Sequence, residues 1–259
     1  MECLQLQGRV ALVTGASRGI GKAIALGFAA QGAAVVVAAR SETAGKPGLP
    51  GTIHETVAQI RAQGGRALAV RCDVTDEASV RDMVDQVAAT FEGVDVLVNN
   101  AGVAFGQPAL ETPLKRWELV LRVNLTGAFL CSQAVLPHMI RRGQGSIINI
   151  SSLAADERAD GKVNTGVAYA VAKAGLDRLT WGLASEAGRH GVAVNALKPR
   201  QVVDSEGMRF WSSQEQRKNW TSPAKMVACA VFLARQHAGS VTGVVATDEE
   251  YIAWHGLQL

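Results

Sequence analysis

The sequence predicts a single-domain α/β protein built on a doubly wound, seven-stranded parallel sheet with helices on both faces. Short apolar and β-branched runs alternate along the 259 residues with segments of helical spacing. Several of the runs are apolar throughout, which is typical of strands buried on both faces of a parallel sheet. The alternation continues without an internal repeat or an interdomain linker, and parallel α/β folds often reach this length as one unit.

Each strand of the predicted sheet corresponds to one of these apolar runs. The runs are Val10–Val13, Ala34–Ala38, Ala67–Arg71, Val94–Val98, Ser146–Ile150, Val192–Ala196 and Val244–Ala246. Residues 80–91 carry the clearest helical stripe, and Thr75 is placed to cap that helix. Three longer segments are predicted as loops: Ser41–Gly51, Ala155–Gly166 and Pro199–Ser222. Long loops in compact domains are often lids, so residues 199–222 are expected to cover a substrate.

Composition argues against several classes of partner. The net charge is +3, and the basic residues are scattered rather than gathered into the stripe that nucleic acid or a membrane surface requires. No apolar run reaches the ~18–20 residues of a membrane span. The four cysteines lie far apart, with neither a CxxC pair nor a histidine at zinc-finger spacing, so no metal site is predicted. Cysteines of this kind, and a start without a charged and then apolar leader, predict a cytoplasmic protein.

A glycine-rich turn follows the first predicted strand and leads into a helix. Glycines let the backbone turn tightly and approach a pyrophosphate, while the start of the helix offers free N–H groups and the positive end of its dipole. A merely tight connection between strand and helix is the alternative. The position of the turn favours a dinucleotide site of the Rossmann fold. Its predicted contacts are Gly15, Ser17, Arg18, Gly19, Ile20 and Gly21.

The end of the second predicted strand indicates which dinucleotide binds. An acidic residue at this position would hold the 2′-hydroxyl of NAD(H). The sequence has Arg40 and Ser41 there instead, and Arg18 of the glycine-rich turn can close on the same group. Arginine–phosphate bonds are charge-assisted and can be bidentate. NADP(H) is therefore predicted in preference to NAD(H), the alternative being that both arginines are solvated loop residues.

Tyr169 and Lys173 form a candidate acid–base pair. They are four residues apart on a predicted helix, so both side chains share one face. A phenol has a pKa near ~10, and a nearby ammonium favours the phenolate and lowers that value, as would an oxidised nicotinamide. By itself this spacing is common in surface helices. However, Ser152 follows a predicted strand at the edge where ligands bind in this architecture, and its hydroxyl can donate to a substrate oxygen.

Together these motifs resemble those of the short-chain dehydrogenase/reductase family. The matching pieces occur in the family's order over nearly the whole chain: Thr14–Gly21, Asp73-Val74, Asn99-Asn100-Ala101-Gly102, Asn124, Ser152 and Tyr169-Ala170-Val171-Ala172-Lys173. The resemblance implies that Tyr169 exchanges the proton with the substrate oxygen and that Ser152 orients the carbonyl. Lys173 would lower the Tyr169 pKa and hold the nicotinamide ribose.

The resemblance also implies supporting roles for several other residues. Asn124 would shape a helix so that water links Lys173 to solvent. Asp73 and Val74 would lie near the adenine, and Pro199 on the nicotinamide side. The segment of Asn100, Ala101 and Gly102 would support the sheet beside the cofactor. Relatives commonly form dimers or tetramers, so a homo-oligomer, most simply a homotetramer, is expected.

Some positions depart from the family's pattern. Arg200 follows Pro199 where the family usually has Gly, and Asp204 occupies the expected position of a Thr. Extra residues separate Ser152 from Tyr169. Three segments instead resemble the hydroxysteroid-dehydrogenase-like subgroup: Lys46–Ile53, Asn195–Pro199 and Thr247–Glu250, which replaces the usual Asp-Gly-Gly.

The expected function is hydride transfer between NADP(H) and a small carbonyl or secondary alcohol substrate, with Tyr169 as the general acid–base. Two alternatives remain open. A 3-oxoacyl-thioester reductase would need a basic surface near the cleft for an acidic carrier. A non-catalytic NADP(H)-binding sensor or scaffold is suggested by the irregular Arg200 and Asp204 region, although cofactor binding alone would not require Ser152 and Tyr169.

Overall fold

All seven predicted strands belong to one parallel sheet in the computed structural model, which describes residues 4–43, 50–156 and 166–259. The strand order is β3-β2-β1-β4-β5-β6-β7, as in a doubly wound Rossmann fold. The bounds are β1 Val10–Thr14, β2 Ala34–Ala39, β3 Arg66–Arg71, β4 Val96–Asn99, β5 Gly145–Ile150, β6 Val192–Lys198 and β7 Val245–Thr247. The predicted single-domain fold class is therefore confirmed.

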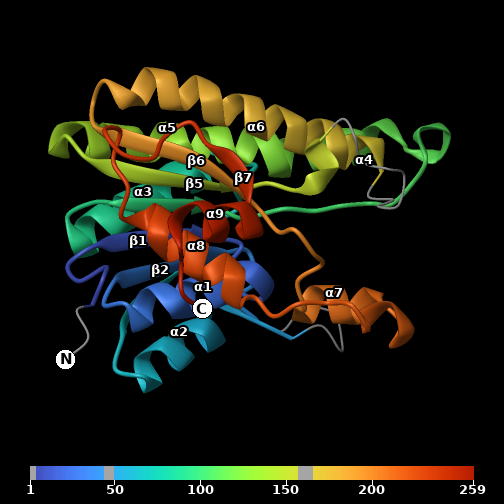
Figure 1. Cartoon of the computed structure of the whole chain (residues 1–259), viewed down its shortest axis with the longest axis horizontal. Helices are drawn as coiled ribbons and strands as arrows, with labels where there is room; N and C mark the ends of the chain where they lie inside the picture. The colour runs from blue at the N-terminus through green and yellow to red at the C-terminus, as the bar shows by residue number, and fades with distance from the viewer. Residues whose placement is uncertain (1–3, 44–49, 157–165) are drawn as a thin grey trace.

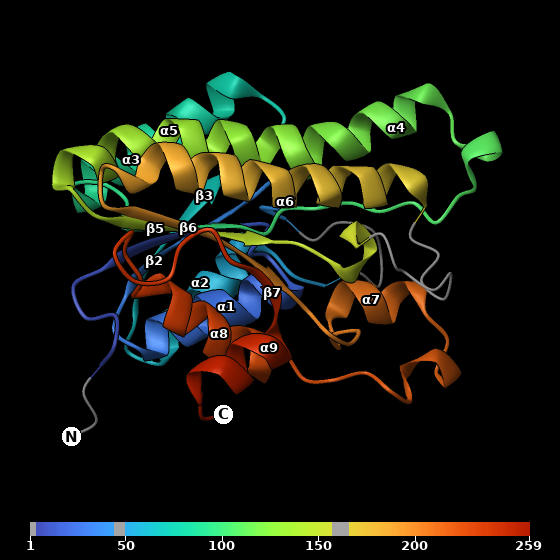
Figure 2. The same ribbon diagram turned by 45° about the horizontal axis from the view of Figure 1, so that its top comes forward.

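Helices cover both faces of this sheet (Figures 1 and 2). One face packs against α3 (Glu77–Phe91), α5 (Gly127–Arg142) and α6 (Val167–Gly188). The other packs against α1 (Gly19–Ala30), α2 (Ile53–Ala62), α8 (Ala224–Ala234) and α9 (Asp248–His255). Two short helices, α4 (Leu114–Leu121) and α7 (Glu206–Trp211), lie at the same end of the molecule (Figure 1).

The two-faced burial follows from the strand sequences. Successive side chains of a strand point to opposite faces. In β1, Val10 and Leu12 join the core under α3 and α5, whereas Ala11 and Val13 join the core under α1 and α8. Because every position of β1 is buried, an uninterrupted apolar run is the pattern that this strand requires.

The start of α3 corrects one expectation. Asp76, not Thr75, caps the helix, and its carboxylate accepts from the N–H of Ala78 at 3.0 Å. The Thr75 hydroxyl instead donates to the carboxylate of Asp73 at 2.8 Å. The Thr75 hydroxyl is therefore already bonded in the turn before the helix, and the next residue, Asp76, caps α3 instead.

One helical run among the described residues, Leu114–Arg142, is long and apolar enough to cross a membrane by length and composition. Core helices also pass that test. Here the run consists of α4, a turn of π-helix at Arg122–Thr126, and α5. The buried side of α5 packs on β4 and β5, so we assign the run to the helical layer of the fold.

Asp95 ties three elements together at the amino edge of the sheet. It precedes β4, and its carboxylate accepts from the N–H of Val10 at 2.8 Å. The other carboxylate oxygen lies 2.6 Å from a guanidinium nitrogen of Arg142, at the end of α5. The Asp95 side chain is only 7% exposed. Without it, the Val10 N–H and the Arg142 guanidinium would lose their partner where water can hardly replace it.

We therefore expect Asp95→Ala to reduce the free energy of unfolding by about 2–4 kcal/mol. Urea unfolding followed by circular dichroism measures this loss. Asp82→Ala is the matched control, because Asp82 is exposed on α3 and its loss should change stability by no more than about 0.5 kcal/mol. Equal unfolding midpoints for the two variants would contradict the role given to Asp95.

Candidate functional site: a dinucleotide cleft with a Ser–Tyr–Lys group

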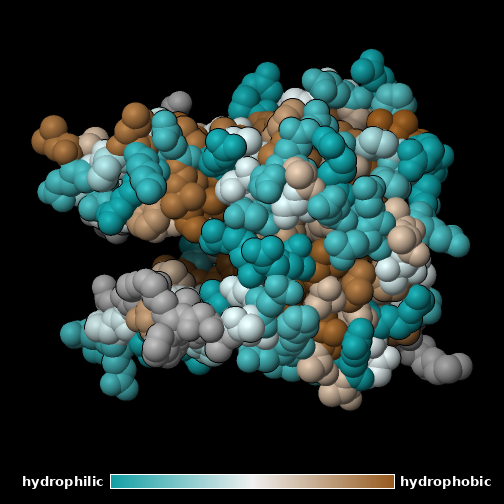
Figure 3. Space-filling model, turned by 180° about the vertical axis from the view of Figure 1, so that it is seen from behind, coloured by the Kyte–Doolittle hydropathy of each residue, from teal (hydrophilic) through white to brown (hydrophobic). Residues whose placement is uncertain are grey.

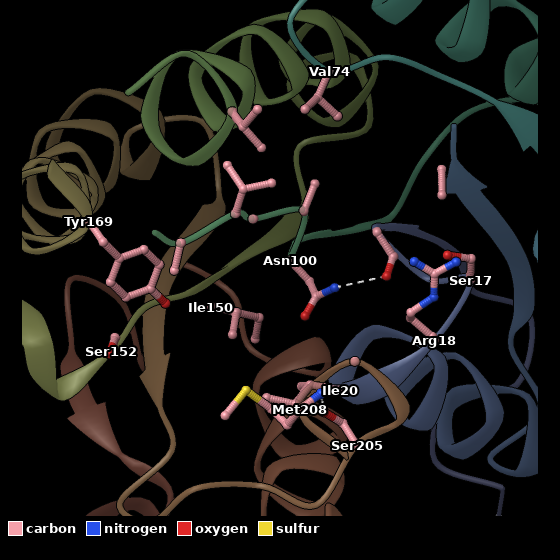
Figure 4. A pocket seen from close by; sticks show the side chains of 18 of the residues that line it. Ser17, Arg18, Ile20, Val74, Asn100, Ile150, Ser152, Tyr169, Ser205 and Met208 are labelled. Carbon is pink, nitrogen blue, oxygen red and sulfur yellow. Dashed lines mark hydrogen bonds between the residues drawn. The ribbon is translucent and has the colours of Figure 1, made fainter. Parts of the chain in front are cut away.

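A cleft of about 840 Å³ opens at the carboxyl edge of the sheet (Figure 3). Figure 4 shows Tyr169 and Ser152 at one end of it, Ser17 and Arg18 at the other, and Asn100 between them. Most of the residues predicted from the sequence to form the site line this cleft. They are Gly15, Ser17, Arg18, Ile20, Arg40, Ser41, Asp73, Val74, Asn100, Ala101, Gly102, Ser152, Tyr169, Lys173 and Pro199.

The glycine-rich turn packs directly against the end of β4. Gly15 has a φ of +65°, and a Cβ on it would lie 2.8 Å from the Cα of Ala101. The Asn100 amide donates to the carbonyl of Thr14 at 2.9 Å, and a Cβ on Gly21 would lie 2.3 Å from the same amide nitrogen. Gly15 and Gly21 thus permit a backbone approach that a side chain would block. This approach leaves the start of α1 beside the cleft, where a diphosphate can meet its N–H groups.

Gly19 and Gly21 do not line the cleft among the described residues. Gly19 begins α1, and its N–H donates to the carboxylate of Glu206 at 2.8 Å. Gly21 is buried beneath Asn100. Both glycines therefore shape the turn, and the direct contacts predicted for them stay predictions.

Arg18 and Ser41 meet at one corner of the cleft. The Arg18 guanidinium donates to Ser41 Oγ at 3.5 Å and to the carbonyl of Gly51 at 2.8 Å. A third bond, from Nε, reaches the carbonyl of Pro50 at 3.0 Å. The guanidinium is therefore held in place by the segment that leads into α2, close to the end of β2.

Arg40 lies at the same corner and faces Asp73. A guanidinium nitrogen of Arg40 is 4.0 Å from a carboxylate oxygen of Asp73. Burial disfavours the Asp73 carboxylate, but hydrogen bonds from Thr75 and the charges of Arg40 and Arg71 outweigh it and lower its pKa. The Arg40 side chain is 59% exposed, so it remains free to turn toward an anion at the mouth of the cleft.

Ser152, Tyr169 and Lys173 gather at the other end. Ser152 follows β5, and Tyr169 and Lys173 lie one turn apart on α6. The Lys173 ammonium donates to the carbonyl of Ile150 at 2.7 Å and lies 5.5 Å from the centroid of the Tyr169 ring. Lys173 is thus anchored to the strand that carries Ser152, which keeps the three side chains together.

Burial changes the pKa values of both Tyr169 and Lys173. Burial raises the pKa of Tyr169, with the Ser152 hydroxyl acting in the opposite direction. Burial also lowers the pKa of Lys173 to about 8, although the Asp177 carboxylate opposes that shift. Burial is the largest cause of both shifts, and it outweighs any lowering of the Tyr169 pKa by Lys173. The lowering expected from Lys173 stays a prediction.

Asn124 lies behind the cleft, in the π-helical turn between α4 and α5. Its amide donates to the carbonyls of Val103 at 2.8 Å and Val120 at 2.9 Å, and its Oδ1 is buried with no hydrogen-bond partner among the described residues. A Cβ on Gly102 would lie 2.8 Å from that oxygen. Turns of π-helix often occur at functional sites. Asn124 thus supports the Gly102–Val103 wall, and its predicted part in a water chain stays a prediction.

Several lining residues were missed by sequence reasoning. They lie at the carboxyl ends of β3, β4 and β5 and on α7: Cys72, Val103, Ala104, Phe105, Gly106, Ile150, Ser151, Ser205, Gly207 and Met208. Position at or after the end of a predicted strand could have indicated the first seven. The last three belong to residues 199–222, which were expected to cover a substrate but were predicted as a loop rather than a helix, and Ser205 and Met208 enter the cleft from there (Figure 4).

The positions that depart from the family's pattern bond to one another or to α7. The N–H of Arg200 donates to the buried carboxylate of Asp248 at 2.9 Å. Asp204 pairs with Arg209 of α7. This bond uses the backbone of position 200, so it depends on the Asp248 carboxylate and not on the arginine side chain. Of the other departures, residues 46–49 of the insert and 157–165 of the extra length lie outside the described residues. Within the described chain, no group of three His, Cys, Asp or Glu residues could hold a metal ion.

The comparisons with known proteins agree with this geometry. Residues 9–216 match the family model for short chain dehydrogenases. Hydroxysteroid dehydrogenase-like protein 2 of Danio rerio is 37% identical over 254 residues, which are 98% of this chain and 60% of that protein. This chain therefore spans less than two thirds of that relative's length. A 3-oxoacyl-[acyl-carrier-protein] reductase of Synechocystis is 43% identical over 195 residues, or 75% of this chain and 74% of that one.

A solved structure is similar along nearly the whole chain. The crystal structure of a Beutenbergia cavernae protein with NADP bound at low occupancy has a TM-score of 0.83 and 36% identity, covering 97% of this chain and 99% of the other. The glycine-rich turn, the parallel sheet and these matches lead to one conclusion. The chain belongs to the short-chain dehydrogenase/reductase family of oxidoreductases.

Proposed function

We propose that this protein transfers a hydride between NADP(H) and a carbonyl or secondary alcohol carbon, with Tyr169 as the general acid–base. The observation that carries the proposal is the meeting of Ser152, Tyr169 and Lys173 at one end of a cleft whose other end is the glycine-rich turn. A nicotinamide dinucleotide bound there supplies or accepts the hydride. The close approach of Gly15 to Ala101 fits such a group, because it keeps side chains away from the diphosphate path.

Each catalytic side chain has a defined task in this proposal. Ser152 donates a hydrogen bond to the substrate oxygen and holds it beside Tyr169. In reduction the Tyr169 hydroxyl gives its proton to that oxygen, and in oxidation the phenolate removes it. Because burial raises the pKa of Tyr169, its hydroxyl is protonated at neutral pH and ready to act as the acid. Lys173, held by Ile150, favours the phenolate while it carries its own charge.

The preference for NADP(H) over NAD(H) belongs to the same proposal. Arg18, Arg40 and Ser41 share one corner of the cleft, and a 2′-phosphate there would meet two guanidinium groups. The bound NADP in the Beutenbergia cavernae protein supports this choice. The Asp73 carboxylate opposes this preference in part, because it already faces the Arg40 guanidinium that would bind the 2′-phosphate.

Two alternatives have some support. The Synechocystis relative is named as a 3-oxoacyl-[acyl-carrier-protein] reductase, so an acyl thioester is a second candidate substrate. A binding protein without turnover is the candidate from another class. The Ser152–Tyr169–Lys173 group argues against it, because cofactor binding alone does not need the serine and tyrosine hydroxyls.

We also propose that residues 199–222 act as a lid and that the chain forms a homo-oligomer. Ser205, Gly207 and Met208 of the segment line the cleft. Exposed apolar side chains on α5 and α6, namely Phe129, Val167, Val171 and Trp181, supply a surface that a second copy could cover. A small-molecule substrate and a cytoplasmic location complete the proposal.

The first test measures absorbance of the reduced nicotinamide during incubation with a panel of ketones, aldehydes and diketones. We expect NADPH to be consumed, and Tyr169→Phe to lower the rate by about 10²–10⁴-fold through loss of the acid. Tyr251→Phe is the matched control, because Tyr251 is buried against β6 and β7 away from the cleft. This variant should turn over NADPH like the wild type. Tight NADPH binding without turnover of any substrate would favour the binding-protein alternative.

The second test concerns the cofactor. Arg18→Ala and Arg40→Ala should each weaken NADPH binding by about 10- to 100-fold while NADH binding changes little, because a hydrogen bond to a charged group contributes about 1.5–3 kcal/mol. Isothermal titration calorimetry measures both cofactors. Arg81→Ala, on the exposed side of α3, should leave both affinities unchanged. A wild-type preference for NADH, or equal losses for the two cofactors, contradicts the proposed 2′-phosphate site.

The third test concerns the lid. The Glu206 carboxylate accepts from Gly19 N–H and lies 3.3 Å from the Lys22 ammonium, which attaches α7 to α1. Glu206→Gln removes the charge, so hydrogen exchange in residues 203–211 should accelerate roughly 3- to 10-fold, for a loss of ~1 kcal/mol. Glu215→Gln is the control, since Glu215 is exposed in the same segment. If both variants exchange like the wild type, Glu206 does not hold the lid.

A further inference from the structure

A row of charged side chains lies behind the catalytic group. Lys198 pairs with both Asp177 and Asp156, and Lys173 lies one helical turn before Asp177 on the same buried face of α6. Lys173, Asp177 and Lys198 are all at least 94% buried, whereas the Asp156 side chain is 46% exposed. Only Lys173 takes part in the proposed reaction, so the two buried charges of Asp177 and Lys198, with the half-exposed Asp156 beside them, still need a role.

The row links α6 to the strand and the turn beside it. Asp177 lies one helical turn after Lys173, on the same buried face of α6. Lys198 ends β6, and its ammonium lies 2.9 Å from Asp177 Oδ2 and 2.5 Å from Asp156 Oδ1. Asp156 directly follows the short 3-10 turn of Leu153–Ala155, which starts at Ser152. The same Lys198 therefore contacts the helix of Lys173 and the turn of Ser152.

Burial makes each of these charges costly unless it is compensated. Burial disfavours the Lys198 ammonium, but its bonds to Asp156 and Asp177 outweigh the cost and raise its pKa. Glu250, at the start of α9, also faces Lys198. For Lys173 the compensation is weaker: burial lowers its pKa, and Asp177 is the charge that opposes the lowering. Tyr169 faces it from α6 with a neutral ring.

We propose that Asp177 is a positioning residue for Lys173, with Lys198 as its counter-ion. The Asp177 carboxylate keeps the Lys173 ammonium charged next to Tyr169, and Lys198 moderates that effect by neutralising part of the carboxylate. Asp177 Oδ1 is buried and has no hydrogen-bond partner among the described residues. One oxygen of the carboxylate is thus bound to Lys198, and the other is not used by a hydrogen bond.

The proposal has a consequence for catalysis, and this part rests on the proposed function. Lys173 can favour the Tyr169 phenolate only while it is an ammonium. Asp177 then sets the pH above which this help is lost. Removing Asp177 should move the loss to lower pH, because Lys173 would face burial and the Lys198 cation without a carboxylate between them. Removing the Lys198 charge should move it to higher pH, because the Asp177 carboxylate would act on Lys173 undiminished.

The test measures the protonation of Lys173 directly. Acetic anhydride labels neutral amines, and Lys173 lines the cleft, where a small reagent can enter. The extent of labelling at each pH is read by peptide mass spectrometry, with the exposed Lys115 and Lys218 of the same chain as internal references. This measurement needs no substrate and no turnover.

We expect Asp177→Asn to lower the labelling midpoint of Lys173 by about one pH unit, a tenfold change in the ratio of ammonium to amine. Lys198→Met should raise the midpoint. The Lys173 midpoint of the double variant should lie above that of Asp177→Asn alone, because the repelling Lys198 cation is gone. Asp156→Asn removes the carboxylate on the other side of Lys198, so it should shift the Lys173 midpoint less than Asp177→Asn does. Circular dichroism verifies that each variant is folded, and the double variant removes both partners of the Asp177–Lys198 ion pair together.

The outcomes separate the two proposals. A folded Asp177→Asn protein whose Lys173 midpoint is unchanged overturns the role of Asp177. Shifts in the same direction for Asp177→Asn and Lys198→Met overturn it as well, since they indicate a general packing defect. Where turnover is found, the alkaline limb of its pH profile should move with the midpoint, and a limb that stays in place overturns the effect on catalysis. Opposite midpoint shifts without any turnover would support Asp177 and count against the proposed function alone.

Discussion

The contact between the turn after β1 and the end of β4 is the constraint on which the site depends. Thr14 Oγ1 accepts from the N–H groups of Asn100 and Ala101 at 3.0 and 3.1 Å, and the Asn100 side-chain amide also donates to the Thr14 carbonyl. Chain connections leave β1 and β4 toward opposite faces of the sheet, so a crevice opens between them. The glycines of the turn let the two backbones meet, and the start of α1 then lies on the floor of that crevice.

Burial is the second constraint, and it acts against the chemistry as well as for it. The same packing that brings Tyr169 and Lys173 together removes water from both, which raises the pKa of the phenol and lowers that of the ammonium to about 8. Electrostatic compensation must therefore come from other charges nearby. The row from Asp177 to Asp156 supplies fixed charges at this place, and it does so from an adjacent strand and turn of the fold.

Three positions that depart from the family's usual residues form contacts with other parts of the chain. Arg200 and Asp248 lie far apart in sequence, and the backbone N–H of Arg200 donates to the Asp248 carboxylate. Asp204, another departure, pairs with Arg209 on α7. The Asp248 and Asp204 carboxylates thus each have a partner, and the segment after Pro199 is held by them beside the cleft.

The sequence by itself determined the seven strands, the glycine-rich turn and most of the cleft-lining residues, because apolar periodicity and short motifs are local signals. It also placed Ser152, Tyr169 and Lys173 at strand and helix positions that share one edge. Only the tertiary structure decided that residues 206–211 form a helix beside the cleft and that Lys198 joins Asp177 to Asp156. Burial and pairing between residues distant in sequence set these features, and they set the pKa values too, which no spacing along the chain encodes.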